Sequence, residues 1–194
     1  MRKIIKFSVI IIISLVLVTR IYYINHTAEK LDIITFEKGQ TVQIGNNFFE
    51  RSEEMMDGYS VKVLDSEIVP ADKYLDQFGH TLEEQFYSDL DYYYLVTVLI
   101  KNENNKFVGE KGIDFRQWYL QGDDYILRVE EFAYSLANPT VGESRSISLN
   151  EDSEMQFTLP FYVFSNIYTP YEKLIKVPPE LVVALYPEKI MIKL

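Results

Sequence analysis

Cysteine is absent from the 194 residues, and its absence excludes several kinds of chemistry. The chain has no disulfide, no thiolate nucleophile and no lipid-modified cysteine, so an exported domain of this sequence is stabilised by packing. Histidine is scarce too, with two residues, His26 and His80. Because most zinc sites take several histidine or cysteine ligands, we expect neither a zinc centre nor cysteine-based catalysis.

Signature loops of common enzymes are also missing. The sequence contains no glycine-rich phosphate-binding loop. The segment GESRS at residues 142–146 departs from the serine-hydrolase pattern G-x-S-x-G at its last position. We therefore predict that the protein is not an enzyme and needs no cofactor, with bound calcium as the option left open.

Acidic residues outnumber basic residues beyond the first 24 positions. Residues 1–24 contain four basic and no acidic residues, whereas residues 25–194 contain 15 basic and 29 acidic ones, a formal charge of −14. Such a charge disfavours binding to nucleic acid, and to anionic lipid through a basic patch.

The N-terminal segment has the pattern of a membrane anchor. Three basic residues within the first six positions precede the uncharged run 7–19, and Arg20 and the segment IYYI follow. As a helix, residues 7–24 would span about 27 Å, close to the ~30 Å hydrocarbon core of a bilayer. Because no small-x-small cleavage site follows, residues 1–24 are predicted to be an uncleaved signal anchor; a cleaved signal peptide and a buried helix are the alternatives.

Orientation follows from the same basic residues. By the positive-inside rule, the N-terminus stays in the cytoplasm and the rest of this single-pass protein of the cell membrane lies outside. Residues 25–40 are predicted to form a stalk, and residues 41–194 the extracytoplasmic domain. The predicted anchor residues are Phe7, Ile10, Ile13, Leu17 and Arg20.

Beyond the stalk, short segments with alternating apolar residues are separated by turn residues. This pattern predicts a mainly β fold, an antiparallel β-sandwich. A short helical insertion is expected near 70–90, because Pro70 suits a first helical position and Gly79 a helix end. The predicted strands are residues 41–44, 59–63, 92–100, 113–120, 125–129, 132–136, 146–149, 155–159, 181–186 and 189–193.

The stretch DYYYLVTVLIKNENN at residues 91–105 suits either an aromatic ligand platform or a buried strand. Alternation places Tyr92 and Tyr94 on one face and Tyr93 on the other, and both faces are largely apolar. A central strand is therefore predicted. In the strand before it the alternation changes phase at Leu64, ahead of Ile68, which predicts a β-bulge.

This pattern resembles the telokin-like immunoglobulin-type domains of uncharacterised cell-surface proteins from Gram-positive bacteria. The similar segments are YLVTV at residues 94–98 running into Asn102, residues 115–120 ahead of a Gly-Asp turn, and MQFTLP at residues 155–160. The resemblance covers residues 58–165. Two features depart from it: NEDS at residues 150–153 replaces a Pro-Gly turn, and the 70–90 insertion is extra. The resemblance implies an immunoglobulin-like fold and an accessory or binding role.

Trp118 and Arg116 are the candidate ligand-binding residues. Asp114, Arg116 and Trp118 have the same parity in a predicted strand, so they would share one mixed face and expose an aromatic patch. A lone tryptophan in a sandwich more often packs in the core, and ligand contact is the alternative interpretation.

Acidic turns suggest a second kind of site. Asp123 and Asp124, or Asp152 and Glu154, are candidate calcium ligands, because hard oxygen ligands gather in turns. Paired carboxylates would also suit glycoside hydrolysis if a cleft brought two of them together, but solvated surface is the better interpretation of the pairs in so acidic a chain. The pairs are Glu53-Glu54, Glu83-Glu84, Asp89 with Asp91, Asp123-Asp124 and Glu130-Glu131.

The sequence thus predicts a membrane-anchored extracytoplasmic domain with a binding or accessory-subunit role. Its expected partners are the membrane, through the N-terminal helix, and a membrane protein or cell-envelope component. Two alternatives come from other classes: a cell-envelope hydrolase that uses paired carboxylates, and an acidic surface that binds a cation or a basic peptide.

Overall fold

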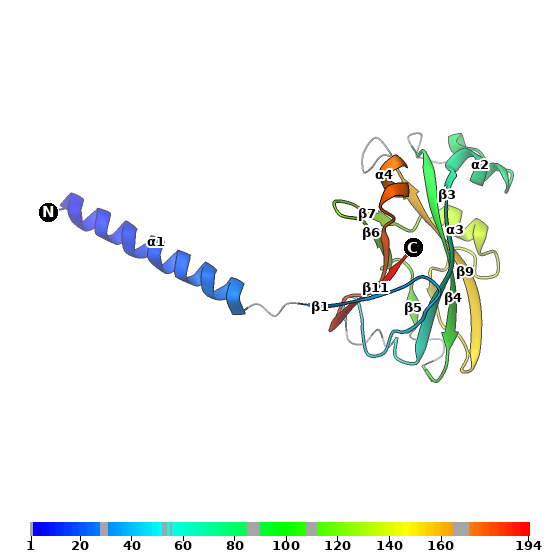
Figure 1. The fold of residues 1–194 in the computed structure, drawn as a ribbon, viewed down its shortest axis with the longest axis horizontal. Coiled ribbons are helices and arrows are strands. Elements are labelled where there is room, and N and C mark those ends of the chain that lie inside the picture. Colours follow the sequence, from blue (N-terminus) through cyan, green and yellow to red (C-terminus); the bar gives the residue numbers. More distant parts are fainter. Residues whose placement is uncertain are drawn as a thin grey trace. The chain divides into compact units, whose positions relative to one another are not determined.

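A computed structural model describes residues 2–27, 31–51, 54, 56–84, 90–107, 112–164 and 171–194. The chain divides into two compact units, Met1–Leu31 and Asp32–Leu194. The first unit contains helix α1 (Arg2–Thr27), drawn in blue in Figure 1.

Helix α1 is apolar along most of its length. Its segment Ile10–Thr27 is long and apolar enough to cross a membrane, and none of it is buried. The predicted anchor residues Phe7, Ile10, Ile13 and Leu17 are each more than half exposed. These are properties of a membrane anchor or a signal sequence, in a helix that continues three residues beyond its predicted end at residue 24.

The second unit is mainly β (Figure 1), as predicted. One sheet has the order β1-β11-β10-β6-β7, a second has the order β2-β3-β4-β9, and β5 pairs with β8. All pairs are antiparallel except β1 with β11, which is parallel. The strands are β1 (Asp32–Phe36), β2 (Thr41–Gln43), β3 (Tyr59–Pro70), β4 (Tyr92–Asn102), β5 (Ile113–Asp114), β6 (Tyr119–Gln121), β7 (Ile126–Arg128), β8 (Ser146–Ile147), β9 (Ser153–Val163), β10 (Glu180–Ala184) and β11 (Glu188–Lys193).

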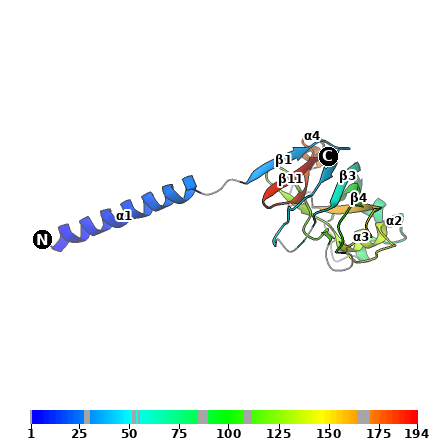
Figure 2. The ribbon, with the colours of Figure 1, turned by 90° about the horizontal axis from the view of Figure 1, so that it is seen from below.

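In the part of the chain that the structure describes, the short helical elements beside the sheets are α2 (Ala71–Asp76), the 3-10 helix η2 (Leu82–Glu84), α3 (Glu131–Ala137) and α4 (Tyr171–Lys176). Figures 1 and 2 show α2 and α3 together beside β3, β4 and β9. The predicted helical insertion is confirmed in α2 and η2, and residues 85–89 of it lie outside the described residues.

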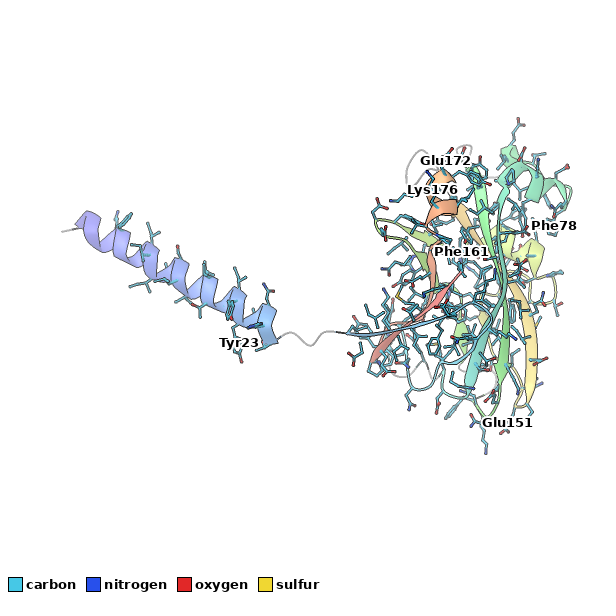
Figure 3. The ribbon with its side chains drawn as sticks, in the orientation of Figure 1. Tyr23, Phe78, Glu151, Phe161, Glu172 and Lys176 are labelled. Atoms are coloured by element: carbon cyan, nitrogen blue, oxygen red, sulfur yellow. The ribbon has the colours of Figure 1, made fainter. Side chains whose placement is uncertain are left out.

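Both larger sheets contribute side chains to one hydrophobic core, which includes Val98, Phe161, Leu181 and Ile192, all fully buried. A second cluster forms on the outer face of β3, β4 and β9, where Tyr93 packs with residues of α2 and α3. Figure 3 shows Phe161 inside the domain and Phe78 on its outer side, at α2. The burial of Tyr93 and Tyr94 in different clusters confirms that β4 is a central strand with two apolar faces.

Three sequence-based assignments are wrong. Residues 132–136 form helix α3 rather than a strand, because the Glu130 carboxylate caps its first turn by accepting two backbone N–H groups. Residues 113–120 form two short strands separated by a turn rather than one strand. The predicted stalk, residues 25–40, contains β1, since residues 32–36 pair with β11.

Candidate functional site

A bulge in β3 creates a polar strip on the outer face of its sheet. The register of β3 with β4 shifts between Val63 and Asp65, which confirms the bulge predicted at Leu64. One extra residue reverses which side chains face the core, so Val63 is buried whereas Asp65 and Glu67 are exposed.

This strip lines a groove of about 250 Å³, called here the outer groove. Asp65 and Glu67 come from β3, Thr97 from β4, Thr158 from β9, and Phe78 from the turn after α2. The hydroxyl oxygens of Thr97 and Thr158 lie 3.4 Å apart. Ala137 of α3 also lines the groove, so five segments of the chain meet at one small depression.

The aromatic side of the outer groove, formed by Tyr74 and Phe78, is fixed by a contact between α2 and α3. Tyr74 is almost fully buried and donates its hydroxyl to the Ala133 carbonyl at 3.0 Å, so α2 is fixed to α3. Burial, together with the charge of Glu130, raises the pKa of Tyr74, which keeps its phenol neutral. The Phe78 ring packs edge-on against Tyr74 at 5.3 Å and remains 39% exposed. Phe78 thus remains partly exposed to solvent beside the groove.

The rim of the outer groove is negatively charged. The backbone N–H of Ser66 and then the Lys38 ammonium, 3.3 Å away, hold the pKa of the Asp65 carboxyl below its usual value. Lys38 also donates to the Ser66 hydroxyl at 2.9 Å. Asp65 is therefore ionised at neutral pH.

Size and chemistry together limit what the outer groove accommodates. Small-molecule sites commonly measure about 300–1,000 Å³, so a groove of about 250 Å³ suits one side chain. Two carboxylates beside an exposed aromatic ring fit an ammonium or guanidinium group on an apolar stem. The arrangement is suited to holding a cationic side chain.

Trp118 does not form an exposed patch. Its side chain is fully buried and packs edge-on against the Phe115 ring at 5.1 Å. The turn at residues 115–117 breaks the strand alternation from which exposure was predicted, and it turns Phe115 and Trp118 toward the core.

Arg116 is exposed but engaged. Its Nε donates to Asp114 Oδ1 at 2.8 Å, its Nη2 donates to Asp114 Oδ2 at 2.5 Å, and Nη2 also reaches the Ser146 hydroxyl at 3.0 Å. Partial burial raises the pKa of Asp114, but the hydrogen bonds and charge of Arg116 lower this pKa by more, so the net shift is downward. Arg116 therefore joins β5 to β8, and it forms no exposed patch with Trp118, which is buried.

The predicted calcium ligands are not clustered. Within the described ranges, no three histidine, cysteine or acidic side chains gather as a metal site. Asp124 forms an ion pair with Lys173 at 2.5 Å, which joins the turn before β7 to α4. Asp152 occupies a turn position with φ of 58°, a conformation that acidic residues tolerate.

Several carboxylates of the acidic pairs have structural partners. Glu54 accepts the backbone N–H groups of residues 49–51 at 2.8–3.1 Å. Glu130 caps α3, and Glu131 forms an ion pair with Arg145 at 2.7 Å. Glu53, Asp89 and the side chain of Glu84 lie outside the described residues.

The sequence interpretation missed the outer groove. A signal was present, because the phase change at Leu64 implies that Asp65 and Glu67 leave the core face. Their proximity to Phe78 and Thr158 carries no sequence signal, since those residues come from other segments.

A family model described as a domain of unknown function, DUF5028, matches residues 33–190. No curated protein matches the chain, and no solved structure matches it.

Proposed function

For this chain, which belongs to the DUF5028 family of domains of unknown function, we propose a role as a membrane-anchored binding module. In this proposal α1 is an uncleaved, single-pass anchor, its N-terminus is cytoplasmic, and residues 32–194 act outside the cell without catalysis. The partner is a basic segment of a membrane protein or of another cell-envelope component.

The observation that carries the proposal is the outer groove with its exposed Phe78 and two carboxylates. The Phe78 ring is 39% exposed, and the Asp65 side chain is 74% exposed even though it pairs with Lys38. Ligand contact accounts for both exposures. The formal charge of −14 beyond the anchor also attracts basic partners over a longer range.

Membrane anchoring rests on a separate observation. The 18-residue segment Ile10–Thr27 is entirely exposed, and exposing so much apolar surface to water would be strongly unfavourable. The second unit has its own hydrophobic core.

The envelope-hydrolase alternative has weaker support. Glycosidase carboxylates flank a cleft roughly 5–10 Å apart. In the described residues Glu54, Glu130 and Glu131 instead bind backbone N–H groups or an arginine.

We also propose that the domain is an immunoglobulin-like sandwich of the kind seen in telokin-like domains of Gram-positive surface proteins. Its support is that two sheets, one antiparallel and one antiparallel except for the β1–β11 pair, contribute side chains to one core. An experimental structure in which the sheets do not face each other would contradict this fold.

Site-directed labelling tests the topology. The chain has no cysteine, so single substitutions Lys6→Cys and Glu151→Cys introduce unique thiols at two exposed positions. In intact cells a membrane-impermeant maleimide should label Glu151→Cys, and it should label Lys6→Cys only after lysis. Release of the protein by alkaline carbonate, or labelling of both positions from outside, would contradict the proposed anchor.

A further inference from the structure

The edges of the two larger sheets differ in how well they are protected against pairing with another strand. Exposed edges are usually blocked by short length, charge, proline, bulges or a covering segment. At β9, the Asn138 side chain bonds to both backbone groups of Thr158, and Glu130 N–H bonds to the Pro160 carbonyl. Pro160 itself removes a donor. The edge of β9 is therefore covered around residues 158–160.

Two other edges carry similar protection. Strands β2 and β7 have three residues each, and Arg128 adds a charge to β7. The part of β3 that extends beyond β2 contains the bulge at Leu64, two acidic side chains and Pro70. Each of these edges is a poor template for a further strand.

Strand β1 is less protected, because it has no proline and no bulge, and its one charged residue, Asp32, lies at its first position. It consists of the five residues DIITF, pairs with β11 without a register shift, and has no partner on its other side among the described residues. Figures 1 and 2 show it at the edge of its sheet beside β11. Ile33 is 62% exposed, the most exposed large apolar side chain among the described residues of the second unit.

The sequence of β1 complements itself in an antiparallel pair. With Ile34 at the centre, Ile33 of one copy lies opposite Thr35 of the other, and Asp32 lies opposite Phe36. No like charges meet, and the β-branched residues at 33–35 suit cross-strand contact. Such a two-fold contact uses the same surface on both copies, so it closes at a dimer.

We infer that β1 is a dimerisation edge, where two copies of this chain join their five-stranded sheets through antiparallel pairing centred on Ile34. The inference rests on the proposed function in one respect: a shared membrane anchor confines copies to one surface and raises their effective concentration. The charge of each domain opposes association, but ions screen it beyond about 8 Å at physiological ionic strength.

Disulfide crosslinking tests the register. Two differently tagged full-length copies are co-expressed, one with Ile33→Cys and one with Thr35→Cys, and oxidised in native membranes. Directly opposite Cβ atoms lie about 4.5–5.5 Å apart, so the mixed pair should give a disulfide-linked heterodimer at several times the yield of either variant alone. The matched control is Ile126→Cys on β7, another exposed edge isoleucine, which should give no more than background.

A second variant separates dimerisation from folding and from anchoring. Ile33→Lys adds an edge charge at an exposed position, so it should reduce co-purification of the two tagged copies several-fold while leaving the thermal unfolding midpoint unchanged. Both assays are repeated on purified full-length protein in detergent, where topology plays no part. Equal crosslinking by Ile126→Cys, crosslinking only to a different protein, or unchanged co-purification of Ile33→Lys would each overturn the inference.

Discussion

The Asn138 side chain pairs with the backbone of Thr158 as a neighbouring strand would. Its Oδ1 accepts the Thr158 N–H at 3.0 Å, and its Nδ2 donates to the Thr158 carbonyl at 2.8 Å and to the Tyr134 carbonyl at 2.8 Å. One amide thus ends helix α3 and closes the edge of β9, which carries part of the outer groove.

Replacing Asn138 by alanine should destabilise the domain. The change leaves backbone groups without partners at a buried position, and each such group costs about 1–3 kcal/mol. Urea unfolding of the full-length protein in detergent measures the loss. Asn150→Ala is the matched control, because Asn150 is exposed and its side chain makes no described hydrogen bond. Equal stability of the two variants would contradict this role for Asn138.

Gly58 is expected to tolerate no side chain. Its φ is 87°, and a Cβ atom there would lie 2.6 Å from the Asn105 backbone nitrogen and closer still to the Asn104 side chain. Gly142 also has positive φ, but a Cβ atom there would meet nothing within 4 Å. Gly142→Ala should therefore lose only the backbone preference, about 1–2 kcal/mol, and Gly58→Ala clearly more. Similar unfolding midpoints for both variants would show that the loop at Asn104 can move, at little energetic cost, to make room for a Cβ atom at Gly58.

Tyr125 should make folding sensitive to alkaline pH. Burial, with smaller contributions from the charges of Tyr94 and the neighbouring aspartates, raises the pKa of Tyr125 to about 12. The pKa of Tyr125 is higher in the folded state than in the unfolded state, where it is about 10. The neutral tyrosine therefore contributes its full stabilisation below the unfolded pKa, and that stabilisation is lost as the pH rises through the folded pKa of about 12.

Tyr125→Phe tests that dependence. The hydroxyl is buried and has no hydrogen-bond partner among the described residues, so removing it should leave stability at pH 7 unchanged or higher. The fall in stability between about pH 10 and 12 should become shallower, as measured by urea unfolding at several pH values. A large loss at pH 7 would mean that the hydroxyl has a partner.

The outer groove should bind a lysine-rich peptide through two independent contributions, charge attraction and contact with the Phe78 ring. Asp65→Asn with Glu67→Gln should weaken binding several-fold and reduce its dependence on salt, because screened charge attraction is removed. Phe78→Ala should weaken binding and leave the salt dependence unchanged. Calorimetric titration of the full-length protein in detergent measures both.

The matched control for the groove is Glu143→Gln with Glu151→Gln, which removes the same charge from two exposed positions outside it. If this control weakens binding as much as the groove variant, attraction is due to overall charge and the groove has no specific role.

The sequence by itself determined the features that depend on local pattern. An uncharged run has to form an apolar helix, two-faced alternation has to make β4 a central strand, and a phase change at Leu64 has to appear as a bulge. Each follows from the period of side chains along one segment, and in these three segments the tertiary contacts agree with that period.

Only the tertiary structure decided features that depend on distant contacts. The pattern FAYSL at residues 132–136 alternates like a strand, but capping by Glu130 and packing against the outer sheet face make it helix α3. Trp118 is buried because a turn precedes it. The outer groove joins Asp65 to Phe78 and Thr158 through three-dimensional packing, and no single segment encodes that proximity.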